Sequence, residues 1–271
     1  MKRLLVTGAI ASVFTMAGQS AVAQALGQGA YTGTGLTVTT GVDYSEGEYN
    51  TGSSDNWTWV VPVIVKYETG PVTLKLNVPY VRTKGVNREV GIAQVAASET
   101  QSGLGDTVGS VFYSLLDPSR AVVGLDLGLK VKFVTADKDD DLITTGNMDY
   151  SLQADAYKAF GAVTAFGTLG WVAKGDIDFR DRVTNQWETA NPKDPWYVSI
   201  GASYKLTQET SMGLAYDWRE KLFDGQDNIS EATLFVTHKL TGRWKLQGYG
   251  VAGFSKASPD WGLGATVGYG F

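Results

Sequence analysis

Strict alternation of apolar and polar residues along residues 123–133 is the feature that most restricts the fold of this chain. Successive side chains of a β-strand point to opposite faces. One face carries Val123, Leu125, Leu127, Leu129, Val131 and Phe133, and the other carries Gly124, Asp126, Gly128, Lys130 and Lys132. Charges at such regular spacing do not suit a soluble core, because burying an unpaired charge is costly. A transmembrane β-barrel, apolar outside and hydrated inside, accommodates both faces.

The final stretch, residues 261–271, alternates in the same way and ends on an aromatic residue. Trp261, Leu263, Ala265, Val267, Tyr269 and Phe271 share one face, and the other face is mostly glycine. Its length suits a tilted membrane-spanning strand of about 9–11 residues. The stretch resembles the closing strand of bacterial outer-membrane barrels, which implies that Tyr269 and Phe271 form the signal read by the barrel assembly machinery. Taken alone, this segment also fits a soluble β-sandwich.

The beginning of the chain favours export. Residues 1–23 combine a basic start at Lys2 and Arg3, an apolar stretch, and a small-residue cleavage motif at residues 21–23, which together predict a secretory signal peptide. Residues 24–35 then form a short N-terminal lead-in, and residues 36–271 form the predicted outer-membrane barrel. No later stretch reaches the eighteen apolar residues of a spanning helix. We therefore expect secretion to the outer membrane of a Gram-negative bacterium.

Composition agrees with this class. The chain has 33 Gly, 8 Trp and 13 Tyr, no Cys, and a mean hydropathy of −0.10. A transmembrane barrel needs to be only half apolar, because its inner face is wet. The formal net charge of −5 argues against a nucleic-acid partner, which calls for a basic patch. The expected surroundings are instead outer-membrane lipid and lipopolysaccharide.

The alternating stretches predict twelve antiparallel strands, arranged up and down around the barrel, and an even number returns both chain ends to the periplasm. Long and short connections alternate between them, as on the two rims of an outer-membrane barrel. Aromatic residues gather near both ends of the strands, as in the two membrane-interface girdles. A soluble lipocalin-like barrel is the alternative, but it gives no reason for the girdles. The expected strands are residues 36–44, 57–67, 72–80, 106–115, 123–133, 150–156, 163–171, 196–206, 212–219, 231–240, 244–254 and 261–271.

Several short motifs, taken in order, make the chain similar to one family. They lie at residues 42–47 (VDYSEG), 61–62 (VP), 66–70 (KYETG), 78–80 (VPY), 102–106 (SGLGD), 216–219 (YDWR) and 258–262 (SPDWG). The chain resembles the outer-membrane transporter family named for the meta-cleavage pathway of phenol degradation. The resemblance covers nearly the whole mature chain. It implies a porin-like barrel for the passage of small organic compounds, aromatic ones among them, and does not define the solute.

An enzymatic function is the first alternative, since some outer-membrane lipid hydrolases use Ser and His on a barrel. The chain has one His, His238, which alternation places on the lipid side near the short turns. No nucleophile-elbow or metal-binding spacing accompanies it. Asp137, Asp139, Asp140 and Asp141 could bind calcium, but their spacing is not that of an EF-hand, and a solvated acidic loop explains them better. We expect no catalytic residues, no metal and no cofactor.

The lumen is the more promising place for function. Acids and bases there nearly balance, so strong ion selectivity is not expected. In one interpretation, inward aromatic residues contact an organic solute while charges orient it; in the other, a charge network plugs a structural or adhesive barrel. Alternation also turns Asp43, Lys66, Lys75, Asp106, Asp149, Phe166 and Lys239 inward. The predicted lumen-lining residues are Asp126, Lys130, Lys132, Asp155, Tyr157, Tyr197, Lys205, Asp217, Arg219, Glu231, Phe235, Lys245 and Tyr249.

Overall fold

The computed structural model describes residues 35–49, 56–85, 100–118, 121–137, 139–140, 142–180 and 186–271. The predicted signal peptide, residues 1–23, and all but the last residue of the predicted lead-in lie outside this part of the chain. Within the described ranges the secondary structure is β-strand, and no helix there is long and apolar enough to cross a membrane.

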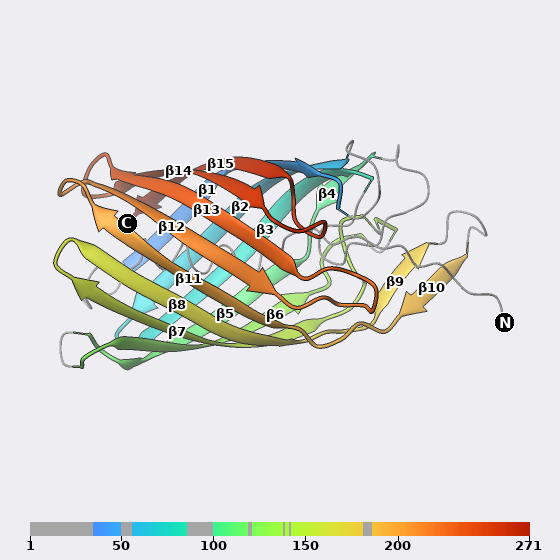
Figure 1. Cartoon of the computed structure of the whole chain (residues 1–271), viewed down its shortest axis with the longest axis horizontal. Helices are drawn as coiled ribbons and strands as arrows, with labels where there is room; N and C mark the ends of the chain where they lie inside the picture. Colours follow the sequence, from blue (N-terminus) through green and yellow to red (C-terminus); the bar gives the residue numbers. More distant parts are fainter. Residues whose placement is uncertain are drawn as a thin grey trace.

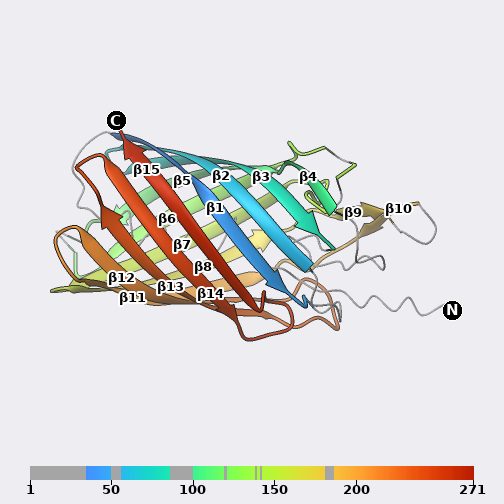
Figure 2. The same ribbon diagram turned by 90° about the horizontal axis from the view of Figure 1, so that it is seen from above.

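Thirteen of the strands form one sheet that closes on itself (Figures 1 and 2). β4 and β5 together make a single crossing, interrupted at residues 105–106, so twelve strands cross the barrel and the predicted fold is confirmed. The strands are β1 (Gly35–Gly47), β2 (Asn56–Thr69), β3 (Val72–Lys84), β4 (Thr100–Leu104), β5 (Thr107–Leu116), β6 (Gly124–Phe133), β7 (Asp149–Phe160), β8 (Val163–Ala173), β11 (Trp196–Lys205), β12 (Thr210–Arg219), β13 (Ile229–Lys239), β14 (Trp244–Gly253) and β15 (Trp261–Gly270).

The first and last strands close the barrel. β1 pairs antiparallel with both β2 and β15, from Thr37 opposite Gly270 to Glu46 opposite Trp261. At the end of this seam the Phe271 N–H donates to the Leu36 carbonyl at 2.9 Å. Closure pairs the backbone groups of these two strands, which an open sheet would expose to hydrocarbon.

The connections define two different rims. We call the end that carries the tight connections, such as Gly161 to Ala162 between β7 and β8, the short-turn rim. The opposite end is the long-loop rim, and it carries the connections at residues 134–148, 174–195, 220–228 and 254–260. Both β1 and β15 have their free ends at the short-turn rim (Figure 2).

Burial in the barrel is the reverse of that in a soluble protein. Along β6 the apolar residues Leu127 and Leu129 are exposed on the outer face, whereas Lys130 and Lys132 are buried. Exposed aromatic residues lie near both rims, with Trp59, Tyr80, Trp196 and Trp261 toward the long loops and Tyr113, Tyr204 and Trp244 toward the short turns. An apolar outer band with aromatic residues at both ends is what a lipid bilayer selects.

Several segments differ from the sequence-based expectations; β1 and β3, for example, continue to Gly47 and Lys84, beyond their predicted ends at Tyr44 and Tyr80. Residues 173–194, expected to form a polar loop, contain a small separate hairpin of β9 (Ile177–Arg180) and β10 (Trp187–Ala190), seen beyond the barrel in Figure 1. Residues 100–104, expected within a loop, form β4 and pair with the end of β3. β7 continues to Phe160, beyond the predicted end at Ala156, because pairing with β8 persists to Phe160 opposite Val163.

Candidate functional site

The predicted lumen-lining residues fall into three groups by exposure. Lys130, Lys132, Asp155, Tyr197, Asp217, Arg219, Glu231 and Phe235 are buried. Asp126, Tyr157, Lys245 and Tyr249 are partly buried, and Lys205 is exposed where β11 ends at the short-turn rim. All of them lie on the face opposite the exposed apolar side chains of their strands. The interior therefore combines charged, aromatic and small polar groups.

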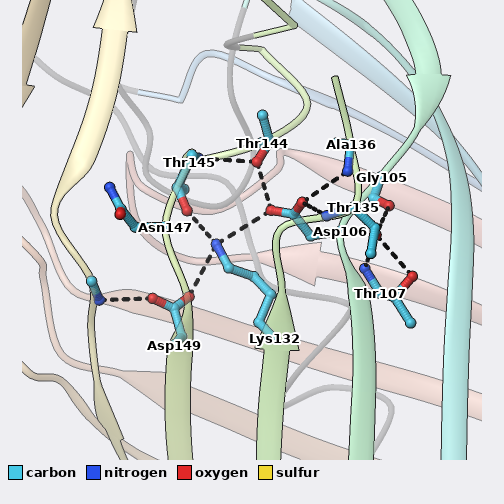
Figure 3. A network of polar contacts seen from close by, with 12 residues as sticks. Gly105, Asp106, Thr107, Lys132, Thr135, Ala136, Thr144, Thr145, Asn147 and Asp149 are labelled. Atoms are coloured by element: carbon cyan, nitrogen blue, oxygen red, sulfur yellow. Dashed lines mark hydrogen bonds and ion pairs between the residues drawn. The ribbon is translucent and has the colours of Figure 1, made fainter. Parts of the chain in front are cut away.

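A buried ionic network occupies the interior near the long-loop rim (Figure 3). The Lys132 ammonium lies 3.5 Å from the Asp106 carboxylate and 3.2 Å from that of Asp149, and all three side chains are almost completely buried. Asp149 also accepts a hydrogen bond from the Lys174 ammonium at 2.6 Å. Two carboxylates and two ammonium groups thus compensate one another, as buried charges must. We call these four residues the rim network.

The rim network fastens the loop between β6 and β7 to the barrel wall. The Thr144 hydroxyl donates to Asp106 at 2.7 Å, and the Lys132 ammonium donates to the Thr145 hydroxyl. The other carboxylate oxygen of Asp106 accepts from the N–H groups of Thr135 and Ala136. Figure 3 shows these groups converging from strands and loop. The expected acidic loop is therefore only partly a solvated segment, since its residues 142–145 are buried.

Described residues of three other long connections, 174–195, 220–228 and 254–260, meet the start of β13 in a small apolar cluster outside the network. Ile177, Leu222, Ile229 and Ala257 pack together, each almost completely buried, although they come from four different segments. A surface ion pair between Lys193 and Asp224 joins two of the same loops and lowers the pKa of that carboxyl group. Shared burial of this kind holds the described loop segments together above the barrel.

A second polar cluster lies deeper in the lumen. Asp155 accepts hydrogen bonds from Thr168 and Gln153, each at 2.6 Å. The Tyr197 hydroxyl donates to the Gln153 carbonyl oxygen at 2.8 Å, and the Lys130 ammonium lies 5.7 Å from the Tyr197 ring centroid. These contacts join β6, β7, β8 and β11 around the Asp155 carboxylate.

The inward aromatic rings lie along the wall, each beside a glycine of the neighbouring strand. Tyr197 is directly opposite Gly170, and a Cβ added to that glycine would lie 2.1 Å from the ring. Tyr249 stands in the same relation to Gly264, again at 2.1 Å. Such close approach is possible only where the neighbour has no side chain. The other pairs are Phe112 with Gly128, Tyr157 with Gly124, Phe166 with Gly201, and Phe235 with Gly213.

His238 lies on the outer face near the short turns. Its side chain is exposed, and Nδ1 is 2.8 Å from the Thr210 hydroxyl of the neighbouring strand. In the part of the chain that the structure describes, its side-chain hydrogen bond is to this threonine and not to a carboxylate. Among the residues that the structure describes, no group of three His, Cys, Asp or Glu residues could hold a metal ion.

The predicted assembly residues lie at the short-turn rim. Tyr269 packs between Trp244 and Phe271, with ring centroids 4.8 Å from each. Phe271 itself is highly exposed. The terminal aromatic residue is therefore accessible at the end of the closing strand.

Sequence reasoning left several members of these clusters out of its site. Gln153, Thr168, Thr144 and Thr145 make central hydrogen bonds, but only their neighbours were singled out. Alternation along β7 did turn Gln153 inward, and that was a usable signal. The two loop threonines had no such signal, because loops above the membrane do not alternate.

Comparison with known proteins places this fold among outer-membrane barrels. An outer-membrane channel from Pseudomonas putida F1 is similar in structure, with a TM-score of 0.65 and 17% sequence identity over 88% of this chain and 96% of that one. The KdgM porin has a TM-score of 0.54 at 8% identity, covering 87% and 99% of the two chains, and the NanC porin has 0.53 at 9%, covering 86% and 97%. No family model and no curated protein sequence matches the chain. At these identities the likeness shows the fold.

Proposed function

We propose that the protein is an outer-membrane channel that passes small organic solutes. The observation that carries this proposal is the reversed burial of the barrel, in which an apolar outer face surrounds an interior of polar, charged and aromatic side chains. A protein that only filled the membrane would gain nothing from taking so many charges out of bulk water. The likeness in fold to a bacterial outer-membrane channel and to two porins supports the same interpretation.

The same reasoning extends to location and family. We infer that the protein resides in a Gram-negative outer membrane, after removal of residues 1–23, with its long loops outside and both termini in the periplasm. The motifs of the sequence favour the transporter family named for the meta-cleavage pathway of phenol degradation. Among the described residues, His238 contacts a threonine on the outer face, which favours transport over hydrolysis.

Single-channel recording in planar bilayers tests the proposed function. Wild-type protein should give discrete conductance steps, and liposomes containing it should swell in small organic solutes. Thr39→Trp, on the inner face of β1, should reduce the conductance, whereas Thr40→Trp, its outward neighbour, should not. A wild-type barrel that inserts but carries no current and no solute would contradict the channel.

A closed structural or adhesive barrel is the second candidate. The rim network and the buried residues 142–145 favour it, because they fasten the loop between β6 and β7 to the inner wall near one rim. Weakening the rim network at Asp106 distinguishes a closed barrel from an open channel. If the loop is a plug, Asp106→Asn should turn a silent barrel into a conducting one; if the lumen is open, wild-type protein conducts already.

Labelling of cysteine variants tests the orientation. Lys256→Cys, at an exposed residue of the loop between β14 and β15, should react with an impermeant maleimide on intact cells. Gly242→Cys, in the turn between β13 and β14, should react only after the outer membrane is opened. Equal labelling of both variants on intact cells would contradict the proposed topology.

We also propose that the exposed Phe271 and its neighbour Tyr269 are read by the assembly machinery. Deleting Phe271 should lower the amount of folded barrel in the outer membrane, measured by heat-modifiable migration in gels. Trp244→Phe serves as the control, since it keeps an aromatic ring beside Tyr269. Wild-type levels of the truncated protein would contradict this role.

A further inference from the structure

Along β13 and β14 the inward-facing charges are separated by depth, although the charges of the whole interior nearly balance. On β13, Glu231 lies directly opposite Asp217 of β12 near the long-loop rim. At the other end of the same strand, Lys239 lies directly opposite Lys245 of β14. The expectation of weak selectivity was drawn from the sum of the charges, and the sum hides this separation.

Near the short-turn rim, two pairs of lysines lie directly across neighbouring strands. Lys66 lies directly opposite Lys75, in the same way as Lys239 lies opposite Lys245. Lys245 also interacts electrostatically with Lys66, and Glu68 pairs with Lys66 at 2.9 Å. Like charges directly across an antiparallel pair are destabilising. Two such pairs within one rim concentrate positive charge on the inner wall.

Two buried polar side chains next to these lysines each have an atom without a hydrogen-bond partner. Thr237 and Gln247 are opposite each other on β13 and β14, one step inside the Lys239 and Lys245 pair. They are only 4% and 7% exposed. The Thr237 hydroxyl and the Gln247 side-chain nitrogen have no partner in the structure. Leaving a buried donor unsatisfied is costly, so such groups are usually bonded or reserved for a ligand.

An aromatic pair forms the next step along the same two strands. Phe235 lies opposite Tyr249, and both belong to the apolar cluster that also contains Phe166. The Tyr249 hydroxyl donates to Asp43 at 3.2 Å, which fixes the direction of the ring. The inner wall of β13 and β14 thus carries an aromatic pair, a pair of neutral donors and a pair of cations in sequence.

We propose that this wall binds an aromatic carboxylate, a claim that rests on the proposed solute channel and specifies its substrate class. Inward positions along a strand are about 7 Å apart, since each residue rises about 3.4 Å. A single ring carrying a carboxylate spans that step. Its ring packs beside Phe235 and Tyr249, and its carboxylate accepts from Thr237 and Gln247. The ammonium groups of Lys239 and Lys245 approach from the short-turn rim and neutralise the charge.

Calorimetric titration of the folded protein in detergent micelles tests this site with benzoate as the probe. Benzyl alcohol keeps the ring without the charge, and acetate keeps the charge without the ring. Benzoate should bind about tenfold more tightly than either. Lys245→Gln should weaken benzoate by about tenfold, the effect of losing a charge-assisted contact, and leave benzyl alcohol unchanged. Thr237→Val removes the hydroxyl at constant shape and should weaken benzoate in the same direction.

Lys158→Gln is the matched control. Lys158 is near the same rim, but it lies on the outer face of the barrel, beside Phe160. Equal affinity for benzoate and benzyl alcohol would overturn the site. The site would also be overturned if benzoate bound more tightly but Lys245→Gln and Thr237→Val weakened its binding no more than Lys158→Gln does. Conductance of the same preparations separates the two proposals: a conducting barrel without benzoate preference refutes only the site, and a benzoate-binding barrel without current refutes only the channel.

Discussion

The two ends of the lumen use lysine in opposite ways. Near the long loops, Lys132 is completely buried, and two carboxylates lie within 3.5 Å of its ammonium group. Near the short turns, Lys239 and Lys245 face each other across two strands, next to donors that have no partner. The first arrangement neutralises its own charge within the fold. The second arrangement presents positive charge to whatever occupies the lumen.

This difference separates stability from recognition inside one barrel. The rim network joins β6, β7 and the break between β4 and β5 to the loop between β6 and β7, so its residues should matter for folding. The pair of Lys239 and Lys245 sets two like charges side by side, so these residues should matter for solute and hardly for folding. Substitutions at matched positions can break or sharpen that contrast.

The largest effect is expected at Lys132. Lys132→Met leaves Asp149 paired with Lys174 alone and leaves the buried Asp106 carboxylate without its cation. The free energy of unfolding should therefore fall by about 3–5 kcal/mol. Urea unfolding in lipid vesicles measures it, with Lys256→Met in an exposed loop as the control. A loss below about 1 kcal/mol would show that the network is not structural.

A smaller effect is expected beside Tyr249 on the inner wall of β13 and β14, where Phe235, Thr237, Lys239, Lys245, Gln247 and Tyr249 form what we call the recognition wall. Gly264→Ala puts a Cβ about 2.1 Å from the Tyr249 ring, and the forced shift should cost about 1–3 kcal/mol of unfolding free energy. Gly242→Ala, in a turn with no atom within 4 Å of the added Cβ, serves as the control. If both substitutions have equal effects on unfolding, the ring does not lie against that glycine.

The smallest effect is expected at Lys245. Lys245→Gln removes one member of a like-charge pair, so the unfolding free energy should stay within about 0.5 kcal/mol of wild type or rise by about 0.2–1 kcal/mol. The same urea titration measures it beside Lys132→Met. A loss comparable to that of Lys132→Met would make the two ends of the lumen equivalent.

The barrel itself could be predicted from the sequence because the membrane imposes it residue by residue. Along β6, lipid on one side and a polar interior on the other force every second residue to change character, and Leu127 and Lys130 record that constraint. The number of crossings and the faces of the strands follow from the same alternation. The connections could be sorted into long and short for the same reason.

The loops could not be predicted in this way, since nothing outside the membrane imposes alternation. Ile177 and Trp187 begin the two strands of a hairpin that resembled an ordinary polar loop in the sequence. Thr144 and Thr145 sit among acidic residues that indicated a solvated segment, yet they bond to Asp106 and Lys132. Those contacts depend on how the loop folds back in three dimensions.

The residues of the recognition wall could be predicted only in part. The sequence turned Lys239 and Lys245 inward, but Thr237 and Gln247 were not singled out, because a single neutral side chain carries little signal. Their importance comes from register, which sets Thr237 directly opposite Gln247. A tight turn at residues 241–243 fixes that register, so the pairing was in principle readable once both strands were recognised.

The central claim, that alternation separates a lipid face from a lumenal face, is tested most directly on β6. We predict that Leu127→Arg lowers the free energy of unfolding in lipid vesicles by about 2–4 kcal/mol, the cost of a cation near the middle of a lipid-facing surface. Lys130→Arg, which places the same side chain on the inner face, should change it by less than about 1 kcal/mol. If Leu127→Arg unfolds at the wild-type urea concentration, the faces are wrongly assigned, and the rim network and the recognition wall lose their basis.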